Sequence, residues 1–538
     1  MASCFPDWMR YKSARFQLEK TQKKILHRIL TKNKYSQFGV KYSFSSINST
    51  KDYQQRVPLS TYDDYVDFIK SICNGGEAVL TEETVQLLEP TSGSISSNKL
   101  IPYTAALKKD FQRGVSPWIF DLFIHQPKLM DGSAYWSLSP VPKATQSIEN
   151  SCIPIGFESD TSYLSNHTKG FMKKIMAVPD QVKMITDISS FQYVTLLFLL
   201  TRSDLRLVSV WNPTFLSILL DCLSKWWDLL LNDLSNGKIN PPGEIGYGLK
   251  NLLELELIQD KNRLQTLKQI DPSKIQSIWP NLSLVSCWAD GNATLFSETL
   301  QKNYLSGILI QGKGLIATEG FMSFPLWGRE GSALSINSHF FEFLPLDGVG
   351  ETLLAHELEM DGQYEVVITT SGGLYRYQLQ DQIQVVGFDK QVPMIRFIGK
   401  AESMSDLFGE KLSEGFVNGI VQGFLKVHHL DATFIMVAPE QDNGRYRYIL
   451  FMDVVPSDTY KKRELESELD RRLRCNYHYD YCRSLGQLNK AKIRLVPTDA
   501  AKRVLEKDCK SGMKLGDIKP AILRSTTGWA DILNGRNI

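Results

Sequence analysis

The segment TSGSISSNKLIPYT, which runs from Thr91 to Thr104, gives the first indication of both fold and function. It follows a predicted strand at Val85, Leu87 and Leu88 and gathers small residues ahead of Lys99, namely Thr91, Ser92, Gly93, Ser94, Ser96 and Ser97. Backbone N–H groups of small residues can turn inward around a phosphate, hydroxyl groups add donors, and a lysine adds positive charge. The Walker pattern GxxxxGK[ST] is absent. The segment alone therefore leaves two interpretations open, a phosphate-binding loop and a polar surface loop.

Length and composition indicate a globular protein with more than one domain. A chain of 538 residues exceeds what one simple hydrophobic core supports, so two or more domains are expected. Hydrophobic residues make up 43% and charged residues 22%, as in ordinary globular proteins. The 61 basic and 59 acidic residues nearly balance, with a net charge of +2. Such a balance supplies no general attraction to nucleic acid or to a membrane surface.

Three further features favour a cytoplasmic location. The most apolar window, Phe191 to Leu200, is too short to span a bilayer. The N-terminal sequence MASCFPDWMRYK lacks the apolar core of a signal peptide. The eight cysteines are scattered without a CxxC pair, which suits reduced thiols better than a disulfide framework. Cys475, His478 and Cys482 match no usual zinc spacing.

Two segments in the first half of the chain carry helical patterns. From Ser13 to Leu30 the pattern predicts one helix packed on the main body, because apolar residues follow one stripe and lysine and glutamine fill the other face. The stripe consists of Phe16, Ile25, Leu26, Ile29 and Leu30. From Gln192 to Lys225 the sequence predicts two mostly buried helices joined by Val210-Trp211-Asn212-Pro213.

A second candidate motif follows residue 307. Ile308 to Ile310 and Leu315 to Ala317 are predicted short strands, with Thr318-Glu319-Gly320 at a strand exit. Ligands bind at strand exits in α/β sheets. A carboxylate there, near a phosphate loop, is a natural Mg²⁺ ligand. An exposed loop glutamate is the alternative, and the local sequence by itself favours it.

A third motif lies in a strand-rich region. Phe340 to Pro345 and Tyr364 to Thr370 are predicted strands, followed by LYRYQLQDQIQVVGF, which alternates like a hairpin or the edge of a barrel. Asp381 is expected between two such strands. An acidic residue in that position can accept both hydroxyls of a ribose. An aspartate that forms a turn is the alternative.

After Arg396 the pattern changes to compact, alternating elements, which predict a small α+β domain. Its expected helices and strands are Ser413 to Phe424, Ala432 to Val437, Tyr446 to Val454, Thr459 to Arg474, Lys492 to Val496 and Asp499 to Lys507. The tail that follows is basic and places Lys519 directly before Pro520.

Taken together, these segments resemble the acyl acid amido synthetases, first known as auxin-responsive proteins of plants and members of the adenylate-forming superfamily, with many bacterial relatives. TSGSISSNKLIPYT is similar to the first ATP motif of that family, LIATEG to the second and YRYQLQD to the third. FEFLP, the P-x-x-x-F spacing at Pro393 to Phe397, and GEKLSE at Gly409 to Glu414 also fit. The resemblance covers nearly the whole chain.

Two positions depart from the family pattern. Ser96-Ser97-Asn98 stand where the first motif usually has a second glycine, and Gln380 stands where the third motif usually has a glycine before its aspartate. Each replacement adds a side chain where backbone can approach a nucleotide closely. A relative that binds an adenylate or an acid without turnover is therefore kept as an alternative.

The resemblance implies a fold of the α/β class. We expect a large N-terminal domain of α/β layers with an associated β-barrel over residues 1–395, which would bind ATP and the acyl substrate. A small, mobile α+β C-terminal domain over residues 396–538 would act as a lid.

The resemblance also implies a set of site residues. The expected ATP- or AMP-binding residues are Thr91, Ser92, Gly93, Ser94, Lys99, Thr318, Glu319, Gly320, Asp381, Lys400 and Lys411. Among them, Glu319 would help to hold Mg²⁺ and Asp381 would anchor the ribose. Lys519 is the expected catalytic residue.

The implied activity uses ATP and Mg²⁺. A carboxylic acid would attack the α-phosphorus to give an acyl-adenylate and pyrophosphate, and an amine, expected to be an amino acid, would then form an amide and release AMP. An acyl-CoA ligase shares the first step and is the alternative from another enzyme class. We expect a cytoplasmic monomer whose partners are small carboxylic acids and amino acids, without nucleic acid or membrane.

Overall fold

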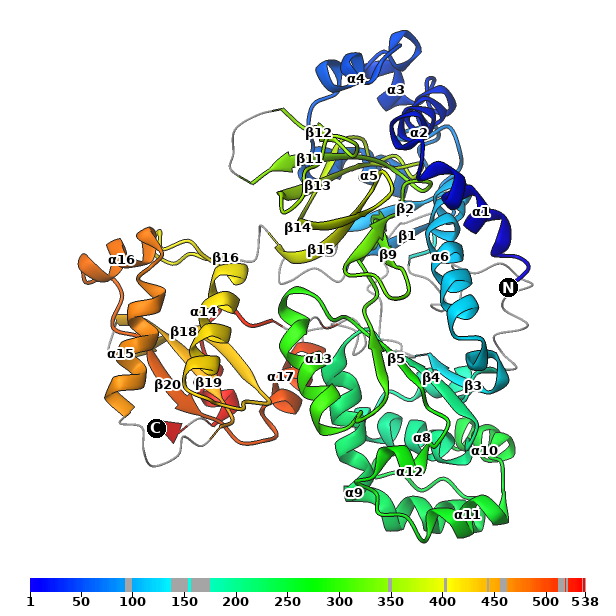
Figure 1. The fold of residues 1–538 in the computed structure, drawn as a ribbon, viewed down its shortest axis with the longest axis vertical. Coiled ribbons are helices and arrows are strands. Elements are labelled where there is room, and N and C mark those ends of the chain that lie inside the picture. Colours follow the sequence, from blue (N-terminus) through cyan, green and yellow to red (C-terminus); the bar gives the residue numbers. More distant parts are fainter. Residues whose placement is uncertain are drawn as a thin grey trace. The chain divides into compact units, whose positions relative to one another are not determined.

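The computed structural model describes residues 1–91, 99–136, 153–155, 175–346, 351–400, 404–442, 445–454, 462–510, 518, 521–534 and 536–537. The chain forms two compact units (Figure 1). Unit 1 comprises Met1–Ser209, Trp226–Ser286 and Gly307–Phe397, and unit 2 comprises Val210–Lys225, Cys287–Ser306 and Ile398–Ile538. The assignment of residues 1–395 to substrate binding and of residues 396–538 to a lid stays a prediction.

Unit 1 contains a seven-stranded sheet with the order β12-β11-β13-β14-β15-β10-β9. Its strands are β9 (Ser323–Pro325), β10 (Ser332–Leu334), β11 (Phe340–Pro345), β12 (Leu353–Leu354), β13 (Gln363–Thr369), β14 (Tyr377–Asp389) and β15 (Val392–Lys400). β11 pairs antiparallel with β12 and β13, and β13 pairs antiparallel with β14. β10 pairs antiparallel with β9 and β15. The two strands predicted from FFEFLP and YEVVITT are confirmed as β11 and β13.

A second, parallel sheet in unit 1 has the order β3-β4-β5-β6. Its strands are β3 (Ser133–Trp136), β4 (Leu205–Ser209), β5 (Leu284–Ser286) and β6 (Leu309–Gln311). The helices α8 (Ile188–Thr201), α10 (Tyr247–Glu256), α11 (Lys261–Leu267) and α12 (Ile275–Ile278) are drawn below this sheet in Figure 1, with α11 the farthest from it. The residues of α8 from Ser190 to Leu200 are all buried, as expected of a helix that is apolar all round.

The prediction of two helices from Gln192 to Lys225 is wrong in one respect. Between α8 and α9 (Pro213–Asn236) the segment Leu205–Ser209 forms β4 rather than part of a helix. The strand is only five residues long, and its sequence LRLVS has one polar side chain, Arg206, between apolar neighbours. Such a run cannot be told from a buried helix by periodicity alone.

The other helices of unit 1 are α1 (Phe5–Ala14), α2 (Leu18–Lys32), α3 (Gln37–Lys41), α4 (Thr50–Arg56), α5 (Val66–Cys73) and α6 (Ala105–His125). The predicted single helix over Ser13 to Leu30 is wrong, because α1 ends at Ala14 and α2 begins only at Leu18. There the Arg15 carbonyl oxygen accepts from the backbone N–H of Gln391, and the Leu18 N–H donates to the Gln391 side chain. Phe16 lies in this break and is 53% exposed, so it is not part of the core stripe.

Unit 2 is built around a four-stranded sheet with the order β18-β19-β20-β21. Its elements include α13 (Thr294–Asn303), β16 (Met404–Ser405), β17 (Leu412–Ser413), α14 (Glu414–Val427), β18 (Ile435–Asp442), β19 (Arg445–Met452), α15 (Lys462–Leu473), α16 (Tyr477–Ser484), β20 (Lys492–Leu495), α17 (Ala500–Lys510), α18 (Trp529–Leu533) and β21 (Arg536–Asn537). Ile435 and Val437 of β18 join one hydrophobic cluster, whereas Phe434, Met436 and Ala438 join another. This alternation means that both faces of the sheet are covered.

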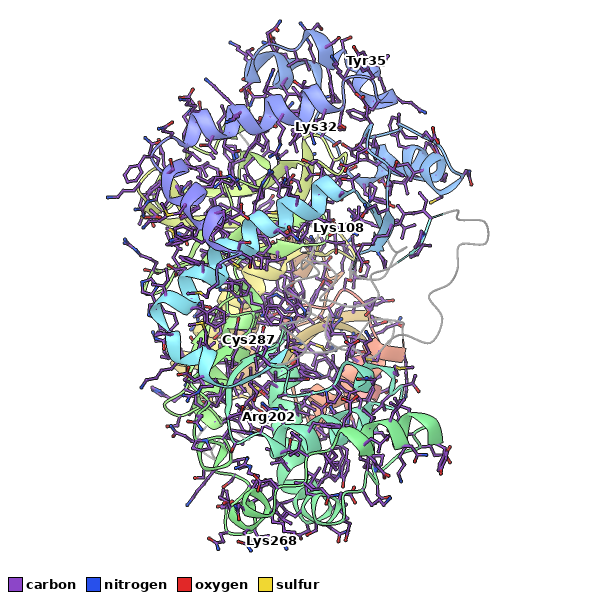
Figure 2. All side chains as sticks on the ribbon, turned by 90° about the vertical axis from the view of Figure 1, so that its right-hand side faces the viewer. Lys32, Tyr35, Lys108, Arg202, Lys268 and Cys287 are labelled. Carbon is purple, nitrogen blue, oxygen red and sulfur yellow. The ribbon has the colours of Figure 1, made fainter. Side chains whose placement is uncertain are left out.

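Basic side chains are spread over unit 1. Lys32, Lys108, Arg202 and Lys268 lie at well-separated points (Figure 2), consistent with the balanced charge of the sequence. Among the helices that the structure describes, none combines the length and the apolarity needed to cross a membrane.

Candidate functional site

The first motif closes a β-hairpin in unit 1. β1 (Leu87–Pro90) pairs antiparallel with β2 (Leu100–Tyr103), and Pro90 lies opposite Leu100. The Thr91 N–H donates to the Lys99 carbonyl oxygen at 2.8 Å, so these two residues form the base of the loop. Ser92, Gly93 and Ser94 lie outside the described residues, and their contact with phosphate stays a prediction. The strand predicted before this loop is confirmed as β1.

Lys99 is half-buried at the start of β2. Its Nζ lies 5.9 Å from the centroid of the Tyr62 ring, and the Tyr62 hydroxyl accepts from the Leu100 N–H at 2.8 Å. A cation over an aromatic face is stabilised by the ring quadrupole. Tyr62 therefore holds both the lysine and the backbone at the end of the first motif.

The second motif forms the tip of another hairpin. Ala317, at the end of β7 (Ile316–Ala317), pairs with Gly320, at the start of β8 (Gly320–Phe321). Thr318 and Glu319, both half-buried, are therefore the two residues of the turn. The predicted strand exit is thus a tight turn that leads directly into another strand.

The turn of the second motif is tied to the hairpin of the first. The Tyr103 hydroxyl, on the last residue of β2, donates to the Thr318 carbonyl oxygen at 2.6 Å. Because Tyr103 is buried, this bond is shielded from water and is stronger than an exposed one. One side chain therefore fixes the hairpin of the first motif against the Thr318–Glu319 turn of the second.

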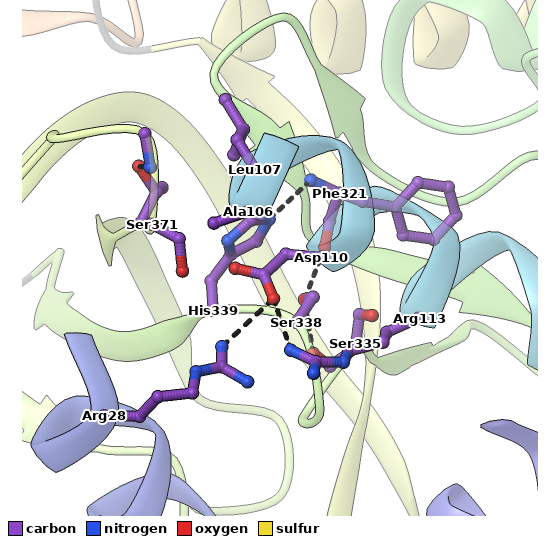
Figure 3. A network of polar contacts seen from close by, with 12 residues as sticks. Arg28, Ala106, Leu107, Asp110, Arg113, Phe321, Ser335, Ser338, His339 and Ser371 are labelled. Atoms are coloured by element: carbon purple, nitrogen blue, oxygen red, sulfur yellow. Dashed lines mark hydrogen bonds and ion pairs between the residues drawn. The ribbon is translucent and has the colours of Figure 1, made fainter. Parts of the chain in front are cut away.

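A buried polar network supports the other side of this turn (Figure 3). His339 Nε2 accepts from the Phe321 N–H at 3.0 Å, and Ser338 Oγ donates to the Phe321 carbonyl oxygen at 3.1 Å. A side chain at Gly320 would clash, since a Cβ there would lie 2.8 Å from His339 Nε2. Nearby, Asp110 accepts from Arg28 at 3.0 Å and from Arg113 at 2.6 Å.

This network keeps His339 neutral. Burial lowers the pKa of the imidazole to about 3, and the Arg28 and Arg113 guanidinium groups add to the effect. A neutral imidazole is required here, because a protonated Nε2 could not accept from the Phe321 N–H. Because Nε2 accepts this hydrogen bond, the single N–H proton of the neutral ring lies on Nδ1.

Acidification should destabilise unit 1 through this histidine. The folded-state pKa of His339 is depressed below its ordinary value, so only the unfolded chain takes up a proton as the pH falls below about 6.5. We expect a loss of about 2 kcal/mol by pH 5 relative to pH 7. His339→Gln, whose amide oxygen can accept the same bond without titrating, should lose less over this interval in denaturant titrations. Equal losses in both proteins would contradict the assignment.

The third motif places Asp381 inside a strand. The segment predicted as a hairpin or barrel edge forms the single strand β14, and the expectation that Asp381 lies between two strands is wrong. The pairing of β14 with β13 shifts between Glu365 and Val367, which marks a β-bulge. Gln380 has a φ of 61° at this bulge, so the strand bends without ending. Asp381 is buried, with 3% of its surface exposed, and its contact with ribose stays a prediction.

The left-handed backbone at Gln380 explains why the family pattern has glycine there. A side chain in this conformation costs roughly 1 kcal/mol, whereas glycine adopts it freely. Gln380→Gly is therefore expected to change the free energy of unfolding by less than about 1 kcal/mol, because relief of strain offsets the greater freedom of the unfolded chain. ATP affinity should be unchanged or tighter.

The matched control is Gln378→Gly. Gln378 lies two residues earlier in β14, and its φ is not positive. It should cost about 0.5–1 kcal/mol, as glycine does inside a strand. Chemical denaturation and nucleotide titration compare the two variants. A Gln380→Gly protein that is less stable than Gln378→Gly, or that loses most of its nucleotide affinity, would show that the bulge is not the glycine position of the motif.

A short segment around Ser60 joins the first and third motifs. The Ser60 N–H donates to the Arg376 carbonyl oxygen at 3.0 Å, and the Gln378 N–H donates to the Ser60 carbonyl oxygen at 2.9 Å. Two residues later, Tyr62 contacts Lys99 and Leu100 as described above. Hydrogen bonds through Tyr103, Tyr62 and Ser60 therefore connect all three motifs within unit 1.

An ion pair that the sequence did not predict fixes the start of the third motif. Arg376, buried and at a φ of 49°, donates through Nε to both carboxylate oxygens of Glu342, at 3.2 and 3.1 Å. Its other nitrogens donate to the carbonyl oxygens of Gln54 and Val57 and to the hydroxyl of Thr352. The available signal was one glutamate in FFEFLP and one arginine in LYRYQL, two opposite charges in otherwise mostly apolar strands.

The remaining expected residues belong to unit 2. Lys400 is the half-buried last residue of β15, and Lys411 is exposed with a φ of 44°. Lys519 lies outside the described residues. The described residues on either side of it are anchored within unit 2. The Ile518 carbonyl oxygen accepts from Asn212 Nδ2 at 2.7 Å, and the Ile522 N–H donates to Glu414 at 2.9 Å.

The single carboxylate of Glu319 suits a metal ion that binds together with a nucleotide. In the part of the chain that the structure describes, no group of three His, Cys, Asp or Glu side chains lies close enough to hold a metal ion. Mg²⁺ commonly binds through one or two carboxylates together with substrate phosphates and waters. One carboxylate on the turn fits that arrangement, and Glu319 is the residue that would supply it.

Comparison with known proteins agrees with this geometry. A solved acyl acid amido synthetase in complex with 2,4-DB superposes with a TM-score of 0.82 at 17% identity, covering 99% of this chain and 95% of that one. Two indole-3-acetic acid-amido synthetases of Arabidopsis thaliana are similar in sequence. GH3.17 is 23% identical, covering 97% of this chain and 93% of the relative, and GH3.2 is 24% identical, covering 75% and 78%.

The chain therefore has the fold of an acyl acid amido synthetase. Three family profiles match it in order: the GH3 family N-terminal domain over residues 10–309, the central domain over residues 332–400 and the C-terminal domain over residues 420–527. The protein belongs to the GH3 family.

Proposed function

We propose that this protein is an ATP-dependent acyl acid amido synthetase. It adenylates a carboxylic acid and transfers the acyl group to an amine, for which an amino acid is the first candidate. The observation that carries the proposal is the convergence of the three motifs in unit 1, through the Tyr103–Thr318 bond and the Ser60 bridge. Family membership and the names of its relatives support the same activity.

The chemistry requires two anions to approach each other, the acid carboxylate and the α-phosphate. Preorganised donors and positive charges are the protein's means of stabilising such a transition state. The Thr91–Lys99 loop would hold phosphate, Glu319 would help to hold Mg²⁺, and Asp381 would anchor the ribose. Lys400, Lys411 and Lys519 are the positive charges assigned to unit 2. Magnesium, when bound, would neutralise phosphate charge.

The location and assembly also belong to this proposal. A cytoplasmic monomer is consistent with a substrate set of small acids, amino acids and ATP. The reduced cysteines that the structure describes include the buried Cys73, Cys222, Cys287 and Cys482, as suits a reducing compartment.

The test is a two-dimensional panel of acids and amines scored for AMP formation, with Mg²⁺ as a variable. The acids are indole-3-acetic acid, 2,4-DB and a set of aryl and alkyl carboxylic acids, and the amines are the common amino acids. We expect acid-dependent exchange of labelled pyrophosphate into ATP, and release of AMP when the matching amino acid is added.

Two outcomes would replace the proposal. If coenzyme A rather than any amino acid drives AMP release, the protein is an acyl-CoA ligase. If acids or AMP raise the melting temperature while no acid supports exchange, the protein binds its ligand without turnover. The altered glycine positions at Ser97 and Gln380 make that second outcome the more informative one to look for.

A further inference from the structure

A buried lysine occupies the carboxyl edge of the parallel sheet in unit 1. Lys313 follows β6 and is only 2% exposed. Its Nζ donates to Ser209 Oγ at 2.7 Å and to Ser286 Oγ at 3.3 Å. These serines are the last residues of the neighbouring parallel strands β4 and β5. The ammonium group therefore lies where parallel sheets usually bind their ligands.

Two tryptophans flank this ammonium group. The ring centroids of Trp118, on α6, and Trp136, at the end of β3, lie 5.5 and 5.4 Å from Lys313 Nζ. Aromatic faces at this distance favour the protonated amine. Trp118 is fixed in turn, because its indole N–H donates to Gln311 Oε1 at 3.1 Å. The contacts thus hold a positive charge at the sheet edge in one defined place.

The helix α6 relates this charge to the second motif. Gly114 lies one turn before Trp118, and a Cβ at Gly114 would be 2.1 Å from the ring of Phe321. α6 therefore packs directly on β8, which begins at the Thr318–Glu319 turn. A spacing of four residues corresponds to about 6 Å along a helix axis. Trp118, which contacts the ammonium group, and Gly114, which packs on β8, thus lie about one helical turn apart along α6.

We propose that Lys313 binds the carboxylate of the acyl acid. A carboxylate oxygen that replaces one of the two serine hydroxyls on Nζ would gain a charge-assisted hydrogen bond, and a buried position strengthens the attraction because water does not screen it. One carboxylate oxygen is held by the lysine, and the other is left to face the nucleotide. The inference rests on the proposed function and adds to it a substrate-binding residue outside the three motifs.

The test compares each acid of the panel with its primary carboxamide, which has a similar shape but no negative charge. In the wild-type protein the acids that bind should bind about 10- to 150-fold more tightly than their carboxamides, as expected for a hydrogen bond to a charged group. In Lys313→Met, which keeps side-chain length without charge, the ratio should fall to about 1. Calorimetry with and without AMP measures both affinities.

The matched control is Arg263→Met. Arg263 is another buried cation of unit 1, and it donates to the carbonyl oxygens of Leu200 at 2.9 Å and Ile278 at 2.7 Å. Its loss should lower the melting temperature but leave the acid-to-carboxamide ratio unchanged. If Lys313 only supports the fold, Lys313→Met should behave like this control and weaken the binding of the acid and of its carboxamide by the same factor.

Two results would overturn the inference. The first is a Lys313→Met protein that keeps the wild-type ratio. The second is a wild-type protein that binds acids no more tightly than their carboxamides, which decides the question even if the variant does not fold. Failure of the proposed function has a different signature, because discrimination between acid and carboxamide would persist while no acid supports AMP formation.

Discussion

Glu342→Gln is expected to lower the free energy of unfolding by about 3–5 kcal/mol, because it leaves the Arg376 guanidinium buried without its counter-charge. Both side chains are almost fully buried, with 1% and 8% exposed. The three described partners of the Arg376 guanidinium other than Glu342 are neutral, so they do not replace the lost charge. Chemical denaturation followed by fluorescence measures the effect.

The control for this prediction is Glu330→Gln. Glu330 also pairs with an arginine of unit 1, Arg396, but its side chain is 70% exposed. Exposed ion pairs contribute about 0–1 kcal/mol, so this variant should stay close to the wild type. If both variants lose less than about 1 kcal/mol, the buried pair does not fix the third motif as the geometry indicates.

Lys519→Ala is expected to slow acyl-adenylate formation by about two to three orders of magnitude, corresponding to roughly 3–4 kcal/mol of transition-state stabilisation. In the rotating-lid scheme that the family resemblance implies, this lysine meets the α-phosphate during the first step only. Aminolysis of a supplied acyl-adenylate should therefore be spared. Asp381→Ala should impair both steps, because the ribose must stay anchored throughout.

Single-turnover kinetics on each half-reaction separates these expectations. The matched control is Lys510→Ala, since Lys510 is the exposed last residue of α17 in the same unit. It should leave both steps unchanged. If Lys519→Ala slows the two half-reactions equally, or behaves like Lys510→Ala, the assigned role is wrong and the lysine is part of a solvated basic tail.

Local sequence patterns predicted the strands that flank the motifs. FFEFLP, YEVVITT and the short apolar runs before Thr318 gave β11, β13, β6 and β7 close to their observed bounds. Two faces of different polarity leave an alternating pattern in the sequence, and a tight turn leaves small or polar residues. β4 was missed because its five residues, LRLVS, are too few for periodicity to separate a strand from the end of a buried helix.

Local sequence patterns were limited in the same way for the candidate site. Motif residues such as Thr318 and Glu319 could be predicted because the resemblance assigns them by position. The residues that hold the motifs together, Tyr103, Tyr62 and His339, could not. Each acts through a hydrogen bond to backbone far away in the sequence, and no local pattern records such a partner. Gln380 lies between these cases, since its departure from the family glycine was visible but its left-handed backbone was not.

The composition of unit 2 also has a consequence for how the protein is made. Phe296, from the segment Cys287–Ser306, packs in one cluster with Val417, Leu450 and Leu523 from the later part of unit 2. A ribosome that adds about 5–20 residues per second needs on the order of 10 to 45 s to travel from Phe296 to Leu523. During that interval the nascent segments Val210–Lys225 and Cys287–Ser306 lack the rest of their core. For the same reason, residues 398–538 expressed alone would expose the apolar surface that Phe296 covers.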